Sequence, residues 1–165
     1  MRDHVPDPTD LPSVSQETLD ETIKKHAMYL RGEQGGARCV IQYRNLSHLD
    51  FRGADLSQAD FAGCLIIHAS LSECKFSGAS FFGCDMRNSD LSDANLTRAD
   101  LRGAYLAGAD LTSAILKEAD LREGKIMKRD EKGVMADRRR SGGVGAKTIL
   151  TGAKLTDTNM TGVQA

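Results

Sequence analysis

A large apolar residue recurs at every fifth position over most of the chain. The eighteen positions, called centres here, are Ile41, Leu46, Phe51, Leu56, Phe61, Ile66, Leu71, Phe76, Phe81, Met86, Leu91, Leu96, Leu101, Leu106, Leu111, Leu116, Leu121 and Ile126. A period of five matches neither the 3.6 residues of a helix nor the two of a strand. Each unit is too short to bury apolar surface alone, so we expect the units to stack as a solenoid.

The bulk composition sets limits on the partners. Lys plus Arg number 22 and Asp plus Glu number 23, so the balanced charge gives no general attraction to nucleic acid or membrane surfaces. No apolar run is long enough to span a membrane, and Met1 to Pro6 lacks the apolar core of a signal peptide. We therefore expect a cytoplasmic location and no direct binding to nucleic acid or membrane.

The unit Ala-(Asp/Asn)-Leu-x-x closely resembles the pentapeptide-repeat family, over residues 39–128 and again over 148–162. This resemblance implies an all-β solenoid, a right-handed quadrilateral β-helix with four repeats in each 20-residue coil. The centres then fall on four faces, which begin with Ile41 (face one), Leu46 (face two), Phe51 (face three) and Leu56 (face four). We interpret all centres as core, with Phe61 and Phe81 stacked on face one.

The ends of the solenoid follow from the flanking sequence. Residues 1–14 are polar and contain proline, so they predict a flexible arm. Residues 15–36 predict an N-terminal capping helix, with Ser15 as N-cap, the helix from about 16 to 31, and Gly35-Gly36 as its stop. The β-helix is expected over residues 37–126. The helix should cover the first coil, and His26 should pack at that junction.

The repeat is interrupted after Ile126 and resumes at Leu150 in a shifted phase. Residues 127–147 form a basic insertion, either a loop or a hairpin that turns at Asp130–Gly133, and residues 148–165 form the final repeats. The insertion carries the basic run Arg138, Arg139 and Arg140. It is either a solvated loop or a partner-binding element on a rigid scaffold.

Catalysis and metal binding find little support in the sequence. The cysteines Cys39, Cys64, Cys74 and Cys84 all occupy the small-residue position, so we expect buried, reduced thiols. His48 and His68 are 20 residues apart and should be neighbours, but no third ligand accompanies them. We therefore predict no catalytic, cofactor or metal site, and a protein that is not an enzyme.

Two surfaces are candidates for a partner. Leu65, Ile67 and Tyr105 occupy outward positions on face two, and Phe82 does so on face one. Face three carries the acids Asp50, Glu73, Asp90, Asp93 and Asp110 with one base, Arg52, at about half the charge density of DNA. These acids either mimic DNA or serve as turn residues of the repeat.

The function predicted from these features is a non-catalytic protein–protein interaction module. The alternative is a DNA-mimicking binder or regulator of a type II topoisomerase, DNA gyrase, because some members of the family that the chain resembles, the quinolone-resistance group, resemble DNA in shape and charge and bind this enzyme. The C-terminal end lacks an evident cap, so either the insertion folds over it or two chains meet there as an end-to-end homodimer. We favour the dimer.

Overall fold

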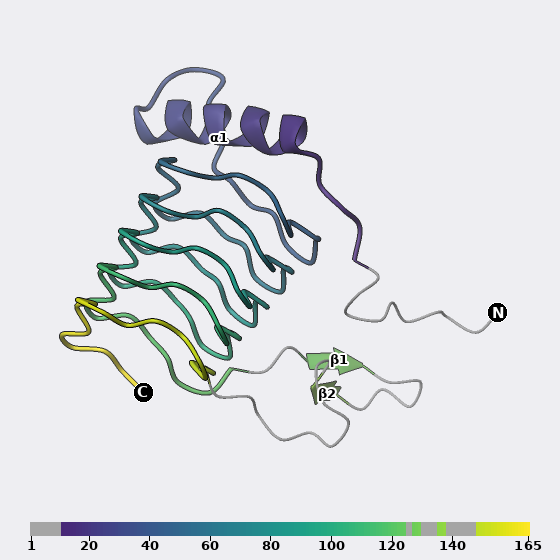
Figure 1. Ribbon diagram of the computed structural model, residues 1–165. Coiled ribbons are helices and arrows are strands. Elements are labelled where there is room, and N and C mark those ends of the chain that lie inside the picture. Colours follow the sequence, from purple (N-terminus) through teal and green to yellow (C-terminus); the bar gives the residue numbers. More distant parts are fainter. Residues whose placement is uncertain (1–10, 125–126, 130–134, 138–147) are drawn as a thin grey trace.

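The computed structural model describes residues 11–124, 127–129, 135–137 and 148–165. Its elements are one helix, α1 (Gln16–Leu30), and two short strands, β1 (Met127–Arg129) and β2 (Met135–Asp137). The rest of the described chain is wound into a stack of coils with α1 lying across its first end (Figure 1). No helix in the described ranges is long and apolar enough to cross a bilayer.

From Val40 to Asp120, parallel bridges join residues 20 positions apart on successive coils, and across the insertion the step is 44 positions. They form four columns, which begin at Val40, Asn45, Asp50 and Asp55 and end at Gln164, Ile149, Lys154 and Asn159 respectively. Each bridging residue directly precedes a centre. The sequence period is thereby confirmed as one repeat per face and four repeats per coil.

Repeats with Asp or Asn before the centre turn their corners by the same local chemistry. Asp90 accepts a hydrogen bond from the main-chain N–H of Ser92 (2.9 Å), and Asp110 does the same for Thr112 (3.0 Å). From Tyr43 to Glu118, the residue two positions after each centre takes a positive φ, which is 58° at Ser113. Asp and Asn favour such turns because their side chains bond the backbone two residues on.

The centres point inward and form one continuous core. From Leu46 to Leu121 every centre is buried, whereas Ile41 in the first coil is half-buried. Phe61 and Phe81 stack with ring centroids 5.4 Å apart, which confirms the predicted pair, and Phe76 meets Phe81 edge-on at 4.9 Å. Aromatic pairs of these geometries add about 0.5–1.5 kcal/mol each beyond the burial of their area.

Helix α1 begins and ends close to the predicted positions, but a different glycine stops it. The Ser15 hydroxyl accepts the N–H of Thr18 at the N-terminus. At the other end the N–H of Glu33 bonds the Met28 carbonyl, and Gly32 adopts a φ of 69°. This 6→1 bond with a left-handed glycine is the Schellman arrangement, so Gly32 rather than Gly35-Gly36 stops the helix.

The first coil is closed by a different group on each of three faces. On face two, Asn45 donates to the Pro12 carbonyl (2.8 Å) and accepts from the N–H of Val14 (3.0 Å). Residues 11–14, predicted as part of a flexible arm, are therefore tied to the coil; residues 1–10 lie outside the described chain. On face three the Gln16 side-chain amide bonds both the N–H (2.8 Å) and the C=O (2.7 Å) of Asp50, as a peptide group would.

The contact on face four comes from a buried histidine. His26 has no exposed surface, and its Nδ1 accepts the N–H of Cys39 at 2.9 Å. Its Nε2 therefore carries the proton and donates to the Ser57 carbonyl, also at 2.9 Å. This neutral tautomer satisfies one donor and one acceptor that the coil leaves open, as the predicted packing role requires.

The last coil is completed by residues that follow the insertion. Tyr105 bridges Ile149, and Leu106 donates to the Ile149 carbonyl, so Leu150 takes the face-two position that the period assigns to Ile126. Ile126 itself lies outside the described residues. Within the insertion, β1 and β2 pair antiparallel, with Met127 opposite Asp137 and Lys128 opposite Ala136. The turn predicted at Asp130–Gly133 lies outside the described residues.

Candidate interaction surfaces

The four apolar side chains predicted to face outward do not form an open patch. Leu65 is buried, with 9% of its surface exposed, and this corrects the prediction that it is available to a partner. It stands in a bridge column between Asn45 and Asp85, so neighbouring coils cover it on both sides. Ile67 and the aromatic rings of Phe82 and Tyr105 are half-buried.

Arginine side chains cover both aromatic rings of this surface. The guanidinium carbon of Arg87 lies 5.1 Å from the centre of the Tyr105 ring, and that of Arg102 lies 5.1 Å from the Phe82 ring. The sequence analysis missed these contacts. The 20-residue period could have predicted one of them, because Phe82 and Arg102 occupy the same repeat position on adjacent coils.

Each of these arginines also forms an ion pair along its own repeat. Arg87 pairs with Asp85 and Arg102 pairs with Asp100, at 2.8 and 2.9 Å. The carboxylate hydrogen bond raises the pKa of each guanidinium. The pairing fixes the planar groups against the rings, so the surface is a preformed layer of aromatic and guanidinium planes.

The acids of face three are distributed over two columns. Asp50, Asp90 and Asp110 stand in the bridge column, which ends at Lys154, while Glu73 and Asp93 occupy positive-φ turns. All are exposed except Asp110, which is half-buried.

Two contacts reduce the negative charge of this face. Arg52 forms a bidentate pair with Asp50 (2.8 and 2.9 Å), and its hydrogen bond lowers the pKa of that carboxyl. The Thr112 hydroxyl and, to a smaller extent, the charge of Lys154 lower the pKa of Asp110. The sequence analysis left out Lys154 and the exposed Asp157 because it did not stack the tail onto this face.

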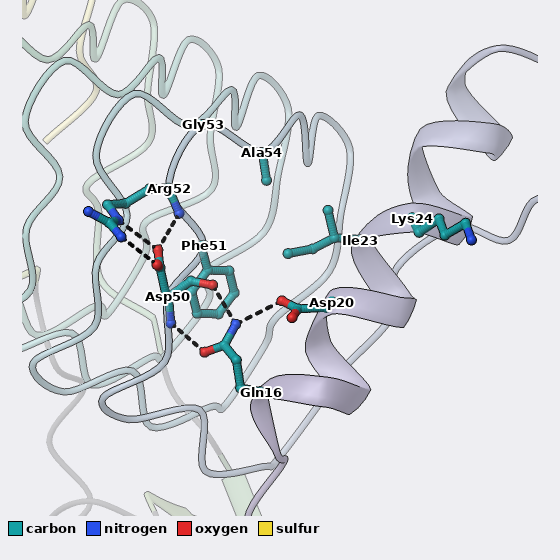
Figure 2. A pocket seen from close by; sticks show the side chains of 9 residues that line it. All are labelled: Gln16, Asp20, Ile23, Lys24, Asp50, Phe51, Arg52, Gly53 and Ala54. Carbon is teal, nitrogen blue, oxygen red and sulfur yellow. Dashed lines mark hydrogen bonds and ion pairs between the residues drawn. The ribbon is translucent and has the colours of Figure 1, made fainter.

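A groove separates α1 from the first coil on face three, with a volume of about 520 Å³. Figure 2 shows the Gln16 amide between Asp20 and Asp50, and Ile23 pointing from α1 toward the coil. Phe51 and Ala54 add apolar wall, and Lys24 and Arg52 add positive charge. The charges of the lining balance, so the groove selects no sign of ligand.

The cysteines predicted to be buried occupy the interior of the coils. All four cysteines are free and buried, and burial raises the pKa of Cys64 and of Cys74 to about 11. Each of these two thiols donates to a main-chain carbonyl of the previous coil, at 3.0 Å. Among the described residues no group of three or more His, Cys, Asp or Glu side chains is placed to hold a metal. Arg138, Arg139 and Arg140 lie outside the described chain.

The repeats are matched by two models of the family. One, described as pentapeptide repeats in eight copies, matches residues 45–83 and 89–125, and another, in nine copies, matches residues 68–104. The chain belongs to the pentapeptide-repeat family. No curated protein matches it in sequence.

Solved structures of pentapeptide repeat proteins are similar to this chain. A pentapeptide repeat protein from the Arabidopsis thaliana thylakoid lumen is 28% identical with a TM-score of 0.57, over 75% of this chain and 68% of that one. Rfr23 from the cyanobacterium Cyanothece 51142 is 22% identical (TM-score 0.33; 76% of this chain, 58% of that one). QnrB1, a plasmid-mediated fluoroquinolone resistance protein, is 20% identical (TM-score 0.23; 76% and 60%). The last two likenesses are too distant to carry a statement on function.

Proposed function

We propose that the chain is a non-catalytic module that binds a protein partner through the surface formed by Ile67, Phe82, Arg87, Arg102 and Tyr105. One observation carries this proposal: two aromatic rings are held under two ion-paired guanidinium groups, 5.1 Å from ring centre to guanidinium carbon in each case. Tyrosine and arginine are enriched among the residues that dominate protein–protein binding energy.

The rigidity of this surface supports the same conclusion. The side chains stand on adjacent coils whose main chains are bonded to one another, as in the 2.7 Å bond from Met86 N–H to Tyr105 C=O. Ordering of side chains costs about 0.5–1.5 kcal/mol per residue on association, and a surface that is already fixed avoids most of that cost. A preformed surface of this kind, spread over two faces, fits another folded protein better than a small molecule.

The test is a pull-down from extracts of the native cell, with the whole chain as bait. Replacing Tyr105 with alanine, or Ile67 with glutamate, should remove the captured partner while circular dichroism remains that of the wild type. The matched control is Ile115→Glu, which introduces the same charge at a 38%-exposed isoleucine on face four. A partner that is lost only with the control variant would refute the proposed surface.

The basic run Arg138, Arg139 and Arg140 is proposed as a second contact for the same partner. The insertion that contains this run follows Gly124 in the sequence, and Gly124 lies at the corner between faces one and two. The insertion therefore starts beside the arginine-covered surface. Exchanging the three arginines for glutamates should weaken capture without affecting the solenoid, and unchanged capture would limit the contact to the coils.

The second candidate is a DNA-mimicking binder of a type II topoisomerase such as DNA gyrase. The observation in its favour is that Glu73 and Asp93 stack on successive coils and, among the described residues, neither has a basic partner. The double variant Asp90→Lys with Asp110→Lys should abolish inhibition in a gyrase supercoiling assay, and binding should weaken steeply with salt. If wild type and variant behave alike, the acids serve only as turn residues.

The last coil is proposed to pair with that of a second copy of this chain. Leu155 is 39% exposed there, and Leu150 and Met160 are half-buried. The coil edge lies opposite α1 in the stack (Figure 1). Met160→Asp should convert an end-to-end dimer into a soluble monomer, as measured by light scattering. A wild-type mass near 17.9 kDa at high micromolar concentration would refute the dimer.

Two further properties belong to the same proposal. The winding is proposed to be the right-handed quadrilateral β-helix that the family implies. The location is proposed to be the cytoplasm, a reducing compartment that suits free cysteines, although the Arabidopsis relative is a lumenal protein. Cell fractionation with an antibody against the chain tests the location.

A further inference from the structure

His48 and His68 place two imidazole rings side by side on adjacent coils. The ring centroids are 5.5 Å apart and the ring planes differ by 13°. Both side chains are exposed, at the corner where face two turns into face three. The pair arises from the coil itself, because both residues stand two positions after a face-two centre and are therefore stacked.

The main chain at both positions is fixed by the ladder of the solenoid. The N–H of His48 bonds the Ile67 carbonyl at 2.9 Å, and that of His68 bonds the Arg87 carbonyl at 3.0 Å. Their φ angles are 65° and 53°, and Asn88 continues the same column with a φ of 56°. The two side chains consequently project in parallel from a rigid base, and only their own torsions remain free.

The ring nitrogens of this pair are available, unlike those of His26. Both nitrogens of His26 are used by main-chain groups inside the cap. In the part of the chain that the structure describes, nothing hydrogen-bonds to the rings of His48 or His68. A neutral imidazole nitrogen is a preferred ligand for Zn²⁺, Ni²⁺ and Cu²⁺.

We propose that His48 and His68 together bind a divalent transition-metal ion between the first and second coils. Bonds of about 2.0–2.1 Å to one ion place two ligand nitrogens about 3 Å apart. Rings at 5.5 Å meet that requirement by tilting toward each other, with no movement of the main chain. Two protein ligands leave the other positions to water, so the ion is exchangeable rather than structural.

Among the described residues, no third His, Cys, Asp or Glu joins the pair, so the site has two protein ligands. The sequence-based prediction of no metal site rested on the same lack of a third ligand. A bound ion would connect two coils that are otherwise held by main-chain bonds. Because a ligand of the folded state alone stabilises it by mass action, the ion should raise the unfolding temperature of the chain.

The test is a titration of the untagged full chain with NiCl₂ by isothermal calorimetry, followed by thermal unfolding with and without the ion. Wild type should bind one Ni²⁺ and unfold at a higher temperature in its presence. His48→Asn and His68→Asn should each bind at least about tenfold more weakly, since loss of a ligand costs no less than loss of an outer-shell partner. Asparagine is the matched replacement because Asn88 shows that it accepts this backbone conformation.

Two controls make the result specific to this pair. His4→Asn should bind Ni²⁺ as wild type does, and MgCl₂ should produce neither heat nor stabilisation, since Mg²⁺ prefers oxygen ligands. Asn88→His adds a ring on the next coil and should tighten binding; unchanged affinity would contradict the stacked geometry. The proposal is overturned if either single variant keeps wild-type affinity, or if His4→Asn loses it.

Discussion

Replacing His26 with alanine should release α1 from the first coil while the rest of the solenoid stays folded. The imidazole is fully buried and satisfies the Cys39 N–H and the Ser57 C=O, each at 2.9 Å. An unsatisfied buried polar group costs about 1–3 kcal/mol, so the loss of both partners should weaken the docking of α1 by about 2–6 kcal/mol.

The Cys39 thiol reports on this local opening. It is 1% exposed beneath the cap, and burial raises its pKa to about 12, so labelling of the wild type by a thiol reagent at pH 8 should be slow. A loss of at least about 2 kcal/mol corresponds to an increase in labelling rate of about thirtyfold or more, since each 1.4 kcal/mol is tenfold. Mass spectrometry after timed quenching identifies the labelled residue.

The internal reference is Cys84, which is fully buried in the middle of the stack. Its labelling should not change in the variant, and Glu21→Ala, on an exposed part of α1, should leave both rates unchanged. If Cys39 reacts no faster in His26→Ala, the two hydrogen bonds do not hold the cap. If Cys39 and Cys84 accelerate together, the cap is not a separate unit, and the reasoning is equally wrong.

Leu91→Asp should abolish cooperative unfolding measured by circular dichroism, because it buries an unpaired charge at a fully buried position, whereas Lys75→Asp at an exposed position should unfold normally. Ser113→Gly should raise the free energy of unfolding in urea by about 1 kcal/mol, because glycine removes the cost of a φ of 58°; Gly53→Ala, where the added methyl meets nothing within 4 Å, should lower it by a similar amount. Burial raises the pKa of Cys74 to about 11, so the folded chain holds its thiol protons more tightly than the unfolded chain. Thiol burial should therefore stabilise the fold fully below about pH 8.5, and this contribution should be lost as pH rises toward 11. A variant with all four cysteines replaced by alanine should lack that part of the alkaline loss in the urea midpoint, and an identical pH profile would contradict the assignment.

The solenoid was predictable because the same five-residue pattern recurs many times along the chain. The apolar centre, the small residue before it and the Asp or Asn between them fixed which side chains point inward, and the period of 20 then placed Phe61 over Phe81. A single exception to the rule carries little weight against so many repetitions.

The rest depended on contacts that the repeat does not encode. Leu65 occupies an outward position yet is buried, because neighbouring coils approach more closely than a one-dimensional pattern reveals. Gly32 ends α1 instead of the more conspicuous Gly35-Gly36, since the main-chain bond from Glu33 to Met28 decides the stop. The pairing of Gln16 with the Asp50 backbone joins residues 34 positions apart and has no signature in either segment.

The insertion sets a direction in which the chain is expected to fold. In the coils before the insertion, bridged residues are 20 positions apart, but the bridge partner of Tyr105 is Ile149, which is 44 positions later. The additional loop entropy is only about 0.7 kcal/mol, from (3/2)RT ln(44/20), so the equilibrium stability of the last coil changes little. The rate at which the last coil forms should decrease more than its stability, because contact between Leu150 and Leu106 requires closure of a longer loop. Assembly should therefore start among the regularly spaced coils near α1 and proceed toward the C-terminus, so the last coil is the last to join and the first to fray.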